Sequence, residues 1–318
     1  MSAVPPRSAK PPDPVDELDV GAVLADWLDA HRRVLVLTGA GCSTGSGIPD
    51  YRDASGAWKR SPPITWQAFT GDPLARARYW ARSHVGWPVV AAARPNPAHL
   101  ALAELEARGQ VECLVTQNVD GLHQRAGSRR VVDLHGRIDM TVCLDCGHRV
   151  PRAAVQAMLD RLNPAWTGLD AGAAPDGDAD LEGLDFGAFR PPCCPACNGL
   201  LKPDVVFFGE NVPRPRVAEA QAALARADAM LVVGSSLMVY SGFRFARAAR
   251  EAGLPLAILT AGVTRADALA TLKLAADAVQ VLPAALGLPP GPASASTGQD
   301  DRADAGPLQV NAPRSAAG

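Results

Sequence analysis

Short apolar runs rich in β-branched residues recur along the middle of this chain, each bounded by turn residues. They barely alternate with polar residues, as is typical of strands buried on both faces. Segments of helical period separate many of them, and this order predicts an α/β fold with a doubly wound parallel sheet. The predicted strands are Val34–Leu37, Val111–Thr116, Val131–Leu134, Met230–Val233, Pro255–Thr260 and Val279–Leu282, and the predicted helices include Ala98–Arg108, Arg216–Ala227 and Phe243–Ala252.

The domain organisation follows from where this alternation stops. A length of 318 residues favours one large or two unequal domains. The interval 137–203 lacks the pattern, holds two Cys-x-x-Cys pairs and contains a Gly/Asp-rich stretch, Thr167–Gly187, that we expect to be a mobile loop. The predicted units are a disordered tail at 1–16, a larger Rossmann-like domain at 17–136 and 204–286, an inserted small domain at 137–203, and a second disordered tail at 287–318.

Charge and hydropathy exclude several classes of partner. Lys and Arg number 31 and Asp and Glu 33, so the formal net charge of −2 gives no bulk attraction to nucleic acid or to an anionic membrane. No apolar run approaches the roughly 18 residues of a membrane span. The first residues lack the apolar core of a secretory signal. We therefore expect a cytoplasmic protein without direct nucleic-acid or membrane partners.

A glycine-rich segment, Thr38–Arg52, directly follows the first predicted strand. Glycines there let the backbone turn tightly and approach a phosphate group. The spacing of Gly39, Gly41 and Gly45 is G-x-G-x-x-x-G, which differs from that of ordinary dinucleotide dehydrogenases, and their ribose-binding acid about 20 residues further on is missing. The segment therefore predicts a phosphate-binding loop of another kind, with a structural turn as the alternative.

Polar residues follow two more of the predicted strands. Gln117, Asn118 and Asp120 come after the strand that ends at Thr116, and His135 follows the one that ends at Leu134. The carboxyl ends of parallel strands meet at one edge of a sheet, where ligands bind. Helix capping remains open for the first group, and a packed side chain for His135. At this edge His135 is a candidate general base.

The cysteines predict a metal site. Without a signal sequence, Cys-x-x-Cys pairs indicate metal ligands rather than disulfides. Two such pairs supply the four thiolates of a closed, tetrahedral structural zinc site, which leaves no coordination position for chemistry. Cys193 and His148 are alternative ligands, and Cys42 and Cys113 are expected to be small apolar residues near strands. The predicted zinc ligands are Cys143, Cys146, Cys194 and Cys197.

Taken in order, these motifs resemble the sirtuins, which are NAD-dependent protein deacylases of the silent-information-regulator type. The resemblance extends over about residues 18–283. Its motifs are Gly39–Ser43, Gly47–Arg52, Thr116–Asp120, Leu134–Gly136, the two Cys-x-x-Cys pairs, Lys202–Glu210 and Gly234–Ser236. Four further segments look like the class II branch, namely Arg78–Arg82, Gly86–Pro88, Val239–Gly242 and Thr264–Asp267.

The resemblance implies that NAD is a co-substrate lying across the sheet edge, and that the zinc is structural. His135 would act as general base and Asn118 would be catalytic by orienting the nicotinamide ribose. An acyl-lysine peptide would enter as an extended strand between Val205–Gly209 and Val239–Gly242. The residues implied to contact NAD are Gly39, Ala40, Gly41, Ser43, Asp50, Tyr51, Arg52, Gln117, Asn118, Val119, Asp120, Gly234, Ser235, Ser236, Thr260, Ala261, Gly262 and Ala278.

The resemblance therefore implies transfer of an acyl group from protein lysine to ADP-ribose, with release of nicotinamide. The same NAD site would also serve protein mono-ADP-ribosyltransfer or NAD hydrolysis, and a non-catalytic NAD- or zinc-binding module is a further alternative. The spacing Tyr79-x-x-Arg82 matches a pair that recognises acidic acyl groups in another branch of the family, and the alternative for Arg82 is a surface charge on a helix.

Overall fold

The computed structural model describes residues 17–59, 63–169, 179, 181 and 184–289. Its main feature is a six-stranded parallel sheet of order β3-β2-β1-β7-β8-β9, so the chain extends outward from β1 in one direction and then in the other. This order confirms the predicted doubly wound α/β fold. The strands are β1 (Val34–Thr38), β2 (Val111–Thr116), β3 (Val131–Asp133), β7 (Ala229–Val233), β8 (Leu256–Leu259) and β9 (Leu272–Leu274).

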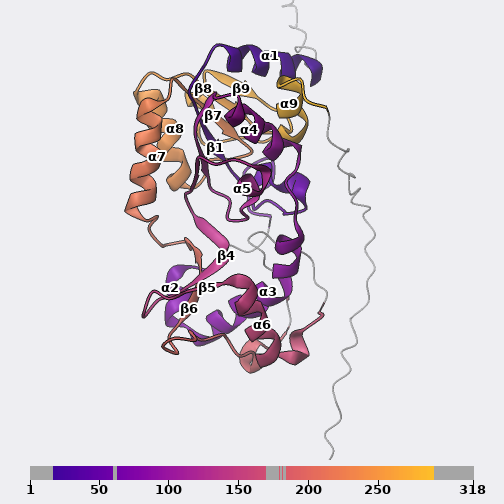
Figure 1. Ribbon diagram of the computed structural model, residues 1–318, viewed down its shortest axis with the longest axis vertical. Helices are drawn as coiled ribbons and strands as arrows, with labels where there is room; N and C mark the ends of the chain where they lie inside the picture. Colours follow the sequence, from indigo (N-terminus) through magenta and orange to yellow (C-terminus); the bar gives the residue numbers. More distant parts are fainter. Residues whose placement is uncertain (1–16, 60–62, 170–178, 180, 182–183, 290–318) are drawn as a thin grey trace, which may run out of the picture.

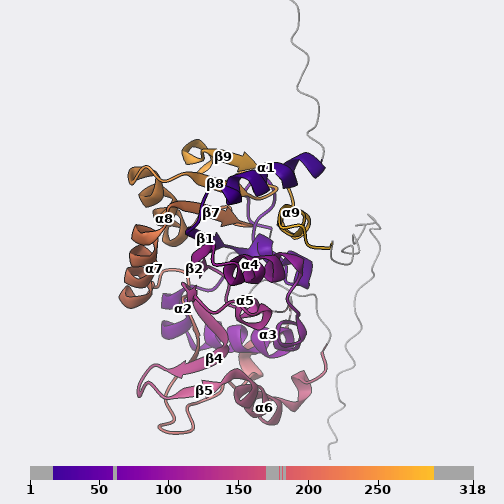
Figure 2. The same cartoon turned by 45° about the horizontal axis from the view of Figure 1, so that its top comes forward.

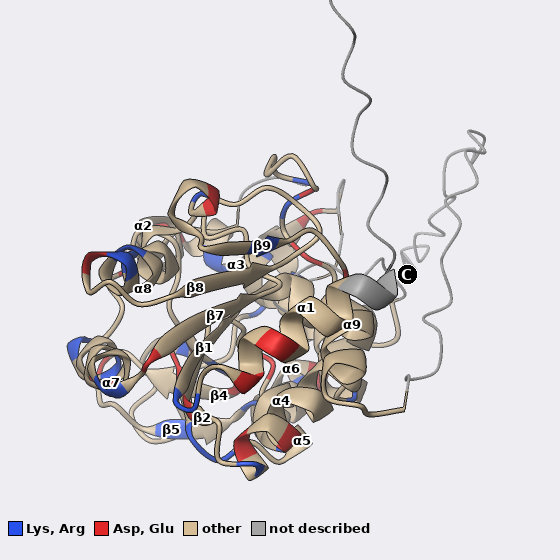
Figure 3. Ribbon diagram, turned by 90° about the horizontal axis from the view of Figure 1, so that it is seen from above, with Lys and Arg blue, Asp and Glu red and all other residues tan. Residues whose placement is uncertain are grey.

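Helices cover both faces of this sheet because successive side chains of a strand point to opposite sides. Val34 and Val36 of β1 pack with α1, α4 and α9, whereas Leu35 and Leu37 pack with α7 and α8. Figure 3 shows the strands between these two helical layers. The helices are α1 (Glu17–Asp29), α4 (Pro97–Ala107), α7 (Arg214–Arg226), α8 (Tyr240–Glu251) and α9 (Ala278–Ala285).

The predicted strand Val279–Leu282 is wrong, because this run lies in helix α9. The Asp277 carboxylate accepts a hydrogen bond from the Val279 amide at 2.9 Å and so caps the start of the helix. The apolar run packs against α1 and α4 instead of joining the sheet. The edge position belongs to β9, whose three residues are too short a run to be recognised from the sequence.

A smaller unit lies below the main sheet in Figure 1, and β4 leads into it directly from His135. Its antiparallel sheet has the order β5-β4-β6. Phe69 of α2 and Trp80 of α3 share its core with Val155 of α6, so two helices from outside the predicted interval 137–203 pack here. The predicted domain boundaries stay a prediction. The elements are β4 (Gly136–Cys143), β5 (Arg149–Pro151), β6 (Leu201–Val205), α2 (Trp66–Gly71), α3 (Pro73–Ala92) and α6 (Arg152–Leu162).

Short helical segments complete the described chain, and Figure 2 shows α5 beside α4. The predicted disordered tail at 1–16, nearly all of the one at 287–318 and much of the predicted loop Thr167–Gly187 lie outside the described residues. Within the described ranges, no helix is both long and apolar enough to cross a membrane. The short segments are α5 (Leu122–Ala126), η1 (Ala40–Cys42), η2 (Thr44–Ser46), η3 (Pro164–Trp166), η5 (Phe186–Ala188) and η6 (Asp267–Leu269).

Candidate functional site

A cavity of about 690 Å³ lies between the carboxyl edge of the main sheet and the end of β6. The residue that directly follows each of β1, β2, β7 and β8 lines it, as a parallel sheet edge predicts. His135 lines it too, as do all the residues expected to contact NAD except Ser43 and Asp120. The structure thus brings together side chains that are up to 239 positions apart in the chain, from Gly39 to Ala278.

The glycine-rich loop packs directly against the loop after β7. The Gly41 amide donates to the Gly234 carbonyl at 2.9 Å, and the Gly39 amide donates to the Val233 carbonyl at 3.1 Å. Gly234 has φ +59°, and a Cβ at this position would lie 2.3 Å from the Cys42 nitrogen. Glycine is required there by both the backbone conformation and the close approach.

Ser43 and Asp120 lie behind the cavity wall and hold Asn118 in place. The Ser43 hydroxyl donates to the Asp120 carboxylate at 2.7 Å. The Asn118 side-chain amide donates to Ser43 Oγ at 2.9 Å and to the Gly39 carbonyl at 3.0 Å. Both hydrogens of the amide are thereby committed to the loop, which leaves its oxygen as an acceptor for a ligand.

His135 has a defined tautomer. Its Nδ1 lies 3.0 Å from the Gln117 carbonyl oxygen, which can only accept, so Nδ1 carries the proton. Nε2 therefore presents its lone pair, which accepts from Ser241 Oγ at 2.8 Å. Burial lowers the pKa of His135 to about 4, the Gln117 carbonyl opposes this shift, and the positive charge of Arg216 adds to it. The ring is neutral near pH 7 and can accept a proton through Nε2.

Several lining residues were given no role from the sequence. Ser241 lies in the segment Val239–Gly242, which the resemblance places beside the peptide, yet nothing in that pattern signals its contact with His135. Tyr79 lines the cavity, whereas Arg82 is absent from the described lining and its backbone carbonyl accepts from the Ala179 amide at 3.1 Å. The apolar part of the lining comes from Ile64, Val206, Phe207, Phe208, Val212, Leu237, Met238, Val239 and Val263.

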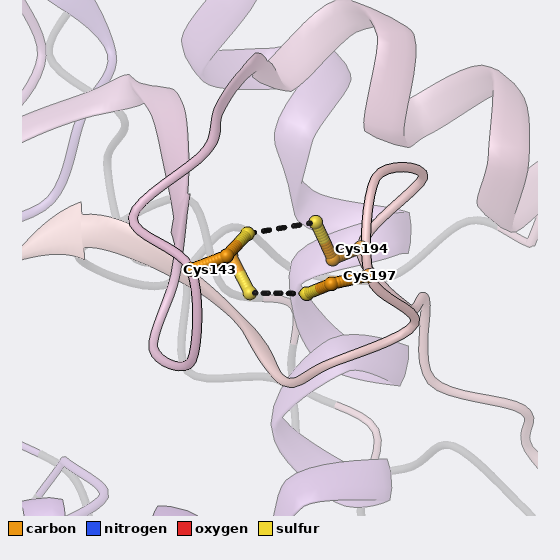
Figure 4. A group of neighbouring side chains, drawn as sticks. Cys143, Cys194 and Cys197 are labelled. Atoms are coloured by element: carbon orange, nitrogen blue, oxygen red, sulfur yellow. Dashed lines mark hydrogen bonds between the residues drawn. The ribbon is translucent and has the colours of Figure 1, made fainter.

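The four predicted zinc ligands gather at one point of the smaller unit. Cys143 ends β4, and Cys194 and Cys197 precede β6; Figure 4 shows their sulfur atoms turned toward one another. The Cys143 and Cys197 sulfurs are 3.5 Å apart, and those of Cys146 and Cys194 are 3.7 Å apart. Tetrahedral Zn–S bonds of about 2.3 Å place sulfurs about 3.8 Å apart, so the donor set fits zinc. Cys193 is exposed and lies outside the group.

The family model that matches this chain is that of the Sir2 family, over residues 39–241. The chain belongs to the Sir2 family. The matched segment begins at the glycine-rich loop and ends at Ser241, and it contains His135 and the four cysteines. Membership confirms the predicted sirtuin resemblance, while the assignment to the class II branch stays a prediction.

Curated relatives of this Sir2 protein carry a common name. It is 60% identical over 277 residues to "NAD-dependent protein deacetylase" of Xanthomonas campestris pv. campestris (strain 8004), covering 87% of this chain and 94% of the relative. A protein of the same name from Bordetella bronchiseptica is 61% identical over 259 residues, covering 81% and 94%. "NAD-dependent protein deacetylase 1" of Streptomyces coelicolor is 51% identical over 254 residues, covering 79% and 85%.

Solved Sir2 structures share the fold. One described as a complex of Sir2, p53 peptide and NAD+ has a TM-score of 0.63 at 34% identity, with 81% of this chain and 93% of that chain covered. A Sir2 variant with deacetylated p53 peptide and 3′-O-acetyl ADP ribose gives a TM-score of 0.68 at 34% identity, with 83% and 96% covered.

Proposed function

We propose that this protein is an NAD-dependent protein-lysine deacylase of the deacetylase type. It transfers the acyl group to ADP-ribose and releases nicotinamide. The observation that carries the proposal is the neutral His135, held with its Nε2 lone pair on a cavity at the sheet edge beside Asn118. Relatives with about 60% identity over most of their length are named as enzymes of this activity, and a related structure contains an acetylated ADP-ribose.

The cavity residues fit NAD, whose bond to nicotinamide supplies the reactive ribose carbon. The contact between Gly41 and Gly234 leaves the loop free of side chains where a pyrophosphate has to approach closely. Asn118 orients the nicotinamide ribose through its side-chain oxygen. Ser43 also holds Asn118, and Asp120 in turn accepts a hydrogen bond from Ser43, in addition to the NAD contacts expected of both residues. The remaining contacts fall to the other lining residues expected to hold NAD.

His135 accepts the proton of a ribose hydroxyl. Such a base must be neutral at working pH and within hydrogen-bonding reach of its substrate. The Gln117 carbonyl fixes the required tautomer, and Ser241 occupies the position that a ribose hydroxyl takes over. His135 is therefore ready to act without a change of protonation state.

The acyl-lysine substrate binds between Val205–Gly209 and Val239–Gly242. Most residues of both segments line the same cavity as His135. Apolar side chains of both segments exclude water. Water therefore does not compete with the amide oxygen of the acyl-lysine, which is a weak nucleophile and attacks slowly. The partners are accordingly acylated proteins or peptides and NAD.

The zinc bound by the four cysteines is structural. Four thiolates complete a tetrahedral shell and leave no position for substrate. Cysteine pairs that serve as metal ligands rather than as disulfides are typical of a reducing compartment, which supports the proposed cytoplasmic location.

One experiment tests the activity. The purified protein is incubated with NAD and a panel of acyl-lysine peptides, and mass spectrometry follows peptide, nicotinamide and O-acyl-ADP-ribose. We expect all three products in equal amounts, with acetyl-lysine among the substrates. ADP-ribose attached to protein without loss of acyl groups would instead identify a mono-ADP-ribosyltransferase. Nicotinamide release that needs no acyl peptide would identify an NAD hydrolase, and NAD binding without turnover a binding module.

A further inference from the structure

A second group of metal-ligating side chains lies behind the glycine-rich loop. Cys42 of η1, His99 of α4 and His123 of α5 place one potential ligand atom each within 4.8 Å of one another. Their exposed fractions are 0%, 0% and 1%. The group shares no residue with the four-cysteine zinc site, and neither the cavity lining nor the proposed reaction uses it.

His123 has a lone pair with no partner. Thr38 Oγ1 donates to Thr116 Oγ1 at 2.8 Å, so it accepts from His123 Nε2 at 2.9 Å, and Nε2 carries the proton. His123 Nδ1 is then the unprotonated nitrogen, and it is buried without a hydrogen-bond partner. An unsatisfied buried acceptor costs free energy that a bound cation would recover.

His99 is held only loosely. Its Nδ1 accepts from the Asn96 amide at 3.3 Å, and its Nε2 faces Ser43 Oγ at 3.5 Å, both at the long end of the hydrogen-bond range. The ring lies against that of His123, with centroids 4.7 Å apart. Burial keeps both rings in the neutral form that metals bind by lowering the pKa of each.

The surrounding charge favours a cation. Burial raises the pKa of the Cys42 thiol, and the negative charges of Asp120 and Asp277 raise it further. Burial lowers the pKa of His99, and Asp120 opposes that shift. Both carboxylates attract a cation, whose own charge would offset the cost of forming the Cys42 thiolate. Thiolate and imidazole together are ligands that suit Zn²⁺ and copper. The cluster thus offers a soft donor set, an unpaired lone pair and a negative surrounding in a dry place.

We propose that Cys42, His99 and His123 form an inhibitory site for a soft metal ion such as Zn²⁺. The Cys42 thiol loses its proton to solvent as the metal–sulfur bond forms, and no electron is transferred. The imidazoles bind as neutral ligands. His99 gives up its contact with either Ser43 or Asn96, depending on the nitrogen it uses.

Inhibition follows from the position of the cluster. Ligands around zinc lie roughly 3.3–3.8 Å apart, so a group spread over as much as 4.8 Å has to contract by up to about 1.5 Å. Cys42 stands between Gly41 and Ser43, and Ser43 holds Asn118. Contraction therefore displaces the loop and Asn118 from the positions that bind NAD. By linkage, bound NAD weakens the affinity of the site for the metal by the same factor by which the metal weakens NAD binding.

The test counts metal on the full chain with its four-cysteine site already loaded. Protein equilibrated with Zn²⁺ and freed of loose ion should carry two zinc per chain. Cys42→Ala should carry one. Cys113→Ala removes another buried cysteine, on β2 and outside the cluster, and should carry two. Equal counts in the wild type and Cys42→Ala, whether one or two, overturn the site.

Two further readouts keep the result interpretable. Co²⁺ added to the zinc-loaded protein should give a thiolate-to-cobalt absorption band in the wild type and in Cys113→Ala, and none in Cys42→Ala. If Cys42→Ala does not fold by circular dichroism, Cys42→Val replaces it. Calorimetry should show NAD binding weakened about tenfold or more by the second Zn²⁺ in the wild type and in Cys113→Ala, but not in Cys42→Ala. Unchanged NAD affinity with the second metal bound overturns inhibition. This readout rests on the proposed function, whereas the metal count does not.

Discussion

At the scale of single residues, His135 is decisive because one hydrogen bond fixes its tautomer and burial fixes its charge. Replacing His135 with alanine removes the base while leaving the glycine-rich loop and the four-cysteine zinc site unchanged. We expect His135→Ala to lose about 10²–10⁴-fold in deacylation rate, with NAD affinity and zinc content close to wild type. Single-turnover kinetics and calorimetry measure the two effects, and near-normal turnover would remove His135 from the mechanism.

Ser241 has a smaller role, since it touches the base but not the reacting bond. Its hydroxyl donates to His135 Nε2, and a typical hydrogen bond contributes about 1 kcal/mol. Because Nε2 has one lone pair, the ribose hydroxyl displaces Ser241 from it, so Ser241→Ala should change kcat by no more than about fivefold in either direction. Ser241→Thr, which keeps a hydroxyl, should stay close to the wild type. A loss as large as that of His135→Ala would mean that Ser241 itself moves the proton.

At the scale of elements, the contact between the loops after β1 and β7 depends on Gly234. Alanine there has both an unfavourable φ and a Cβ 2.3 Å from the Cys42 nitrogen, whereas Gly47, with φ +80°, has open space around its Cβ position. Gly47→Ala isolates the conformational cost, which is on the order of 1–2 kcal/mol. Gly234→Ala should cost more and abolish NAD binding. Denaturant unfolding measures the loss of unfolding free energy in both variants. Equal losses in Gly234→Ala and Gly47→Ala would contradict the close contact between the two loops.

The elements also show what the sequence could and could not predict. Buried parallel strands can be recognised from the sequence because both of their faces are apolar, and the strand Val111–Thr116 begins and ends where predicted. Helix α9 could not be recognised in this way, because Val279–Leu282 is equally apolar and only the Asp277 cap distinguishes it from a strand. Periodicity cannot separate short buried helices from strands.

The functional site, too, could be predicted only in part. Motifs at strand ends located much of the cavity lining, since strand ends share an edge. Whether a side chain faces the cavity or supports its wall depends on contacts between distant segments. The contacts of Ser43 and Asp120 with NAD stay a prediction, and no local pattern signalled their hydrogen bonds to each other and to Asn118. The Ser241 contact with His135 joins residues 106 positions apart, which no local pattern encodes.

At the scale of the whole molecule, buried histidines make stability depend on pH. The pKa of His99 and of His135 is lowered to about 4 from 6.5, with burial the largest cause in each. The unfolded chain therefore binds more protons between these values, so stability falls as pH drops from about 6.5 toward 4. Urea unfolding at pH 7 and pH 5 should show the loss. His135→Ala should reduce the difference in unfolding free energy between pH 7 and pH 5. An unchanged difference would contradict the buried neutral state of His135.

The zinc site ties the smaller unit to the cavity through one core. Cys143 and Cys194 belong to the same apolar cluster as Phe207 and Tyr79, and these two aromatic residues line the cavity. Their rings lie 5.2 Å apart, so the cavity wall rests on the packing that the metal holds together. Losing the metal should therefore affect substrate binding as well as the zinc unit itself.

Cys194→Ser tests this coupling, with Cys193→Ser as the matched control, because Cys193 is exposed and lies outside the ligand group. Removing one ligand forfeits most of the metal affinity, and with it the folding free energy that the metal supplies. We expect Cys194→Ser to lose zinc, to unfold at a clearly lower temperature and to lose peptide binding, whereas Cys193→Ser keeps all three. Metal analysis, calorimetric unfolding and peptide binding measure these effects. If both variants lost zinc alike, the ligand assignment would be wrong; if Cys194→Ser lost zinc but bound peptide normally, the shared core would not transmit the change.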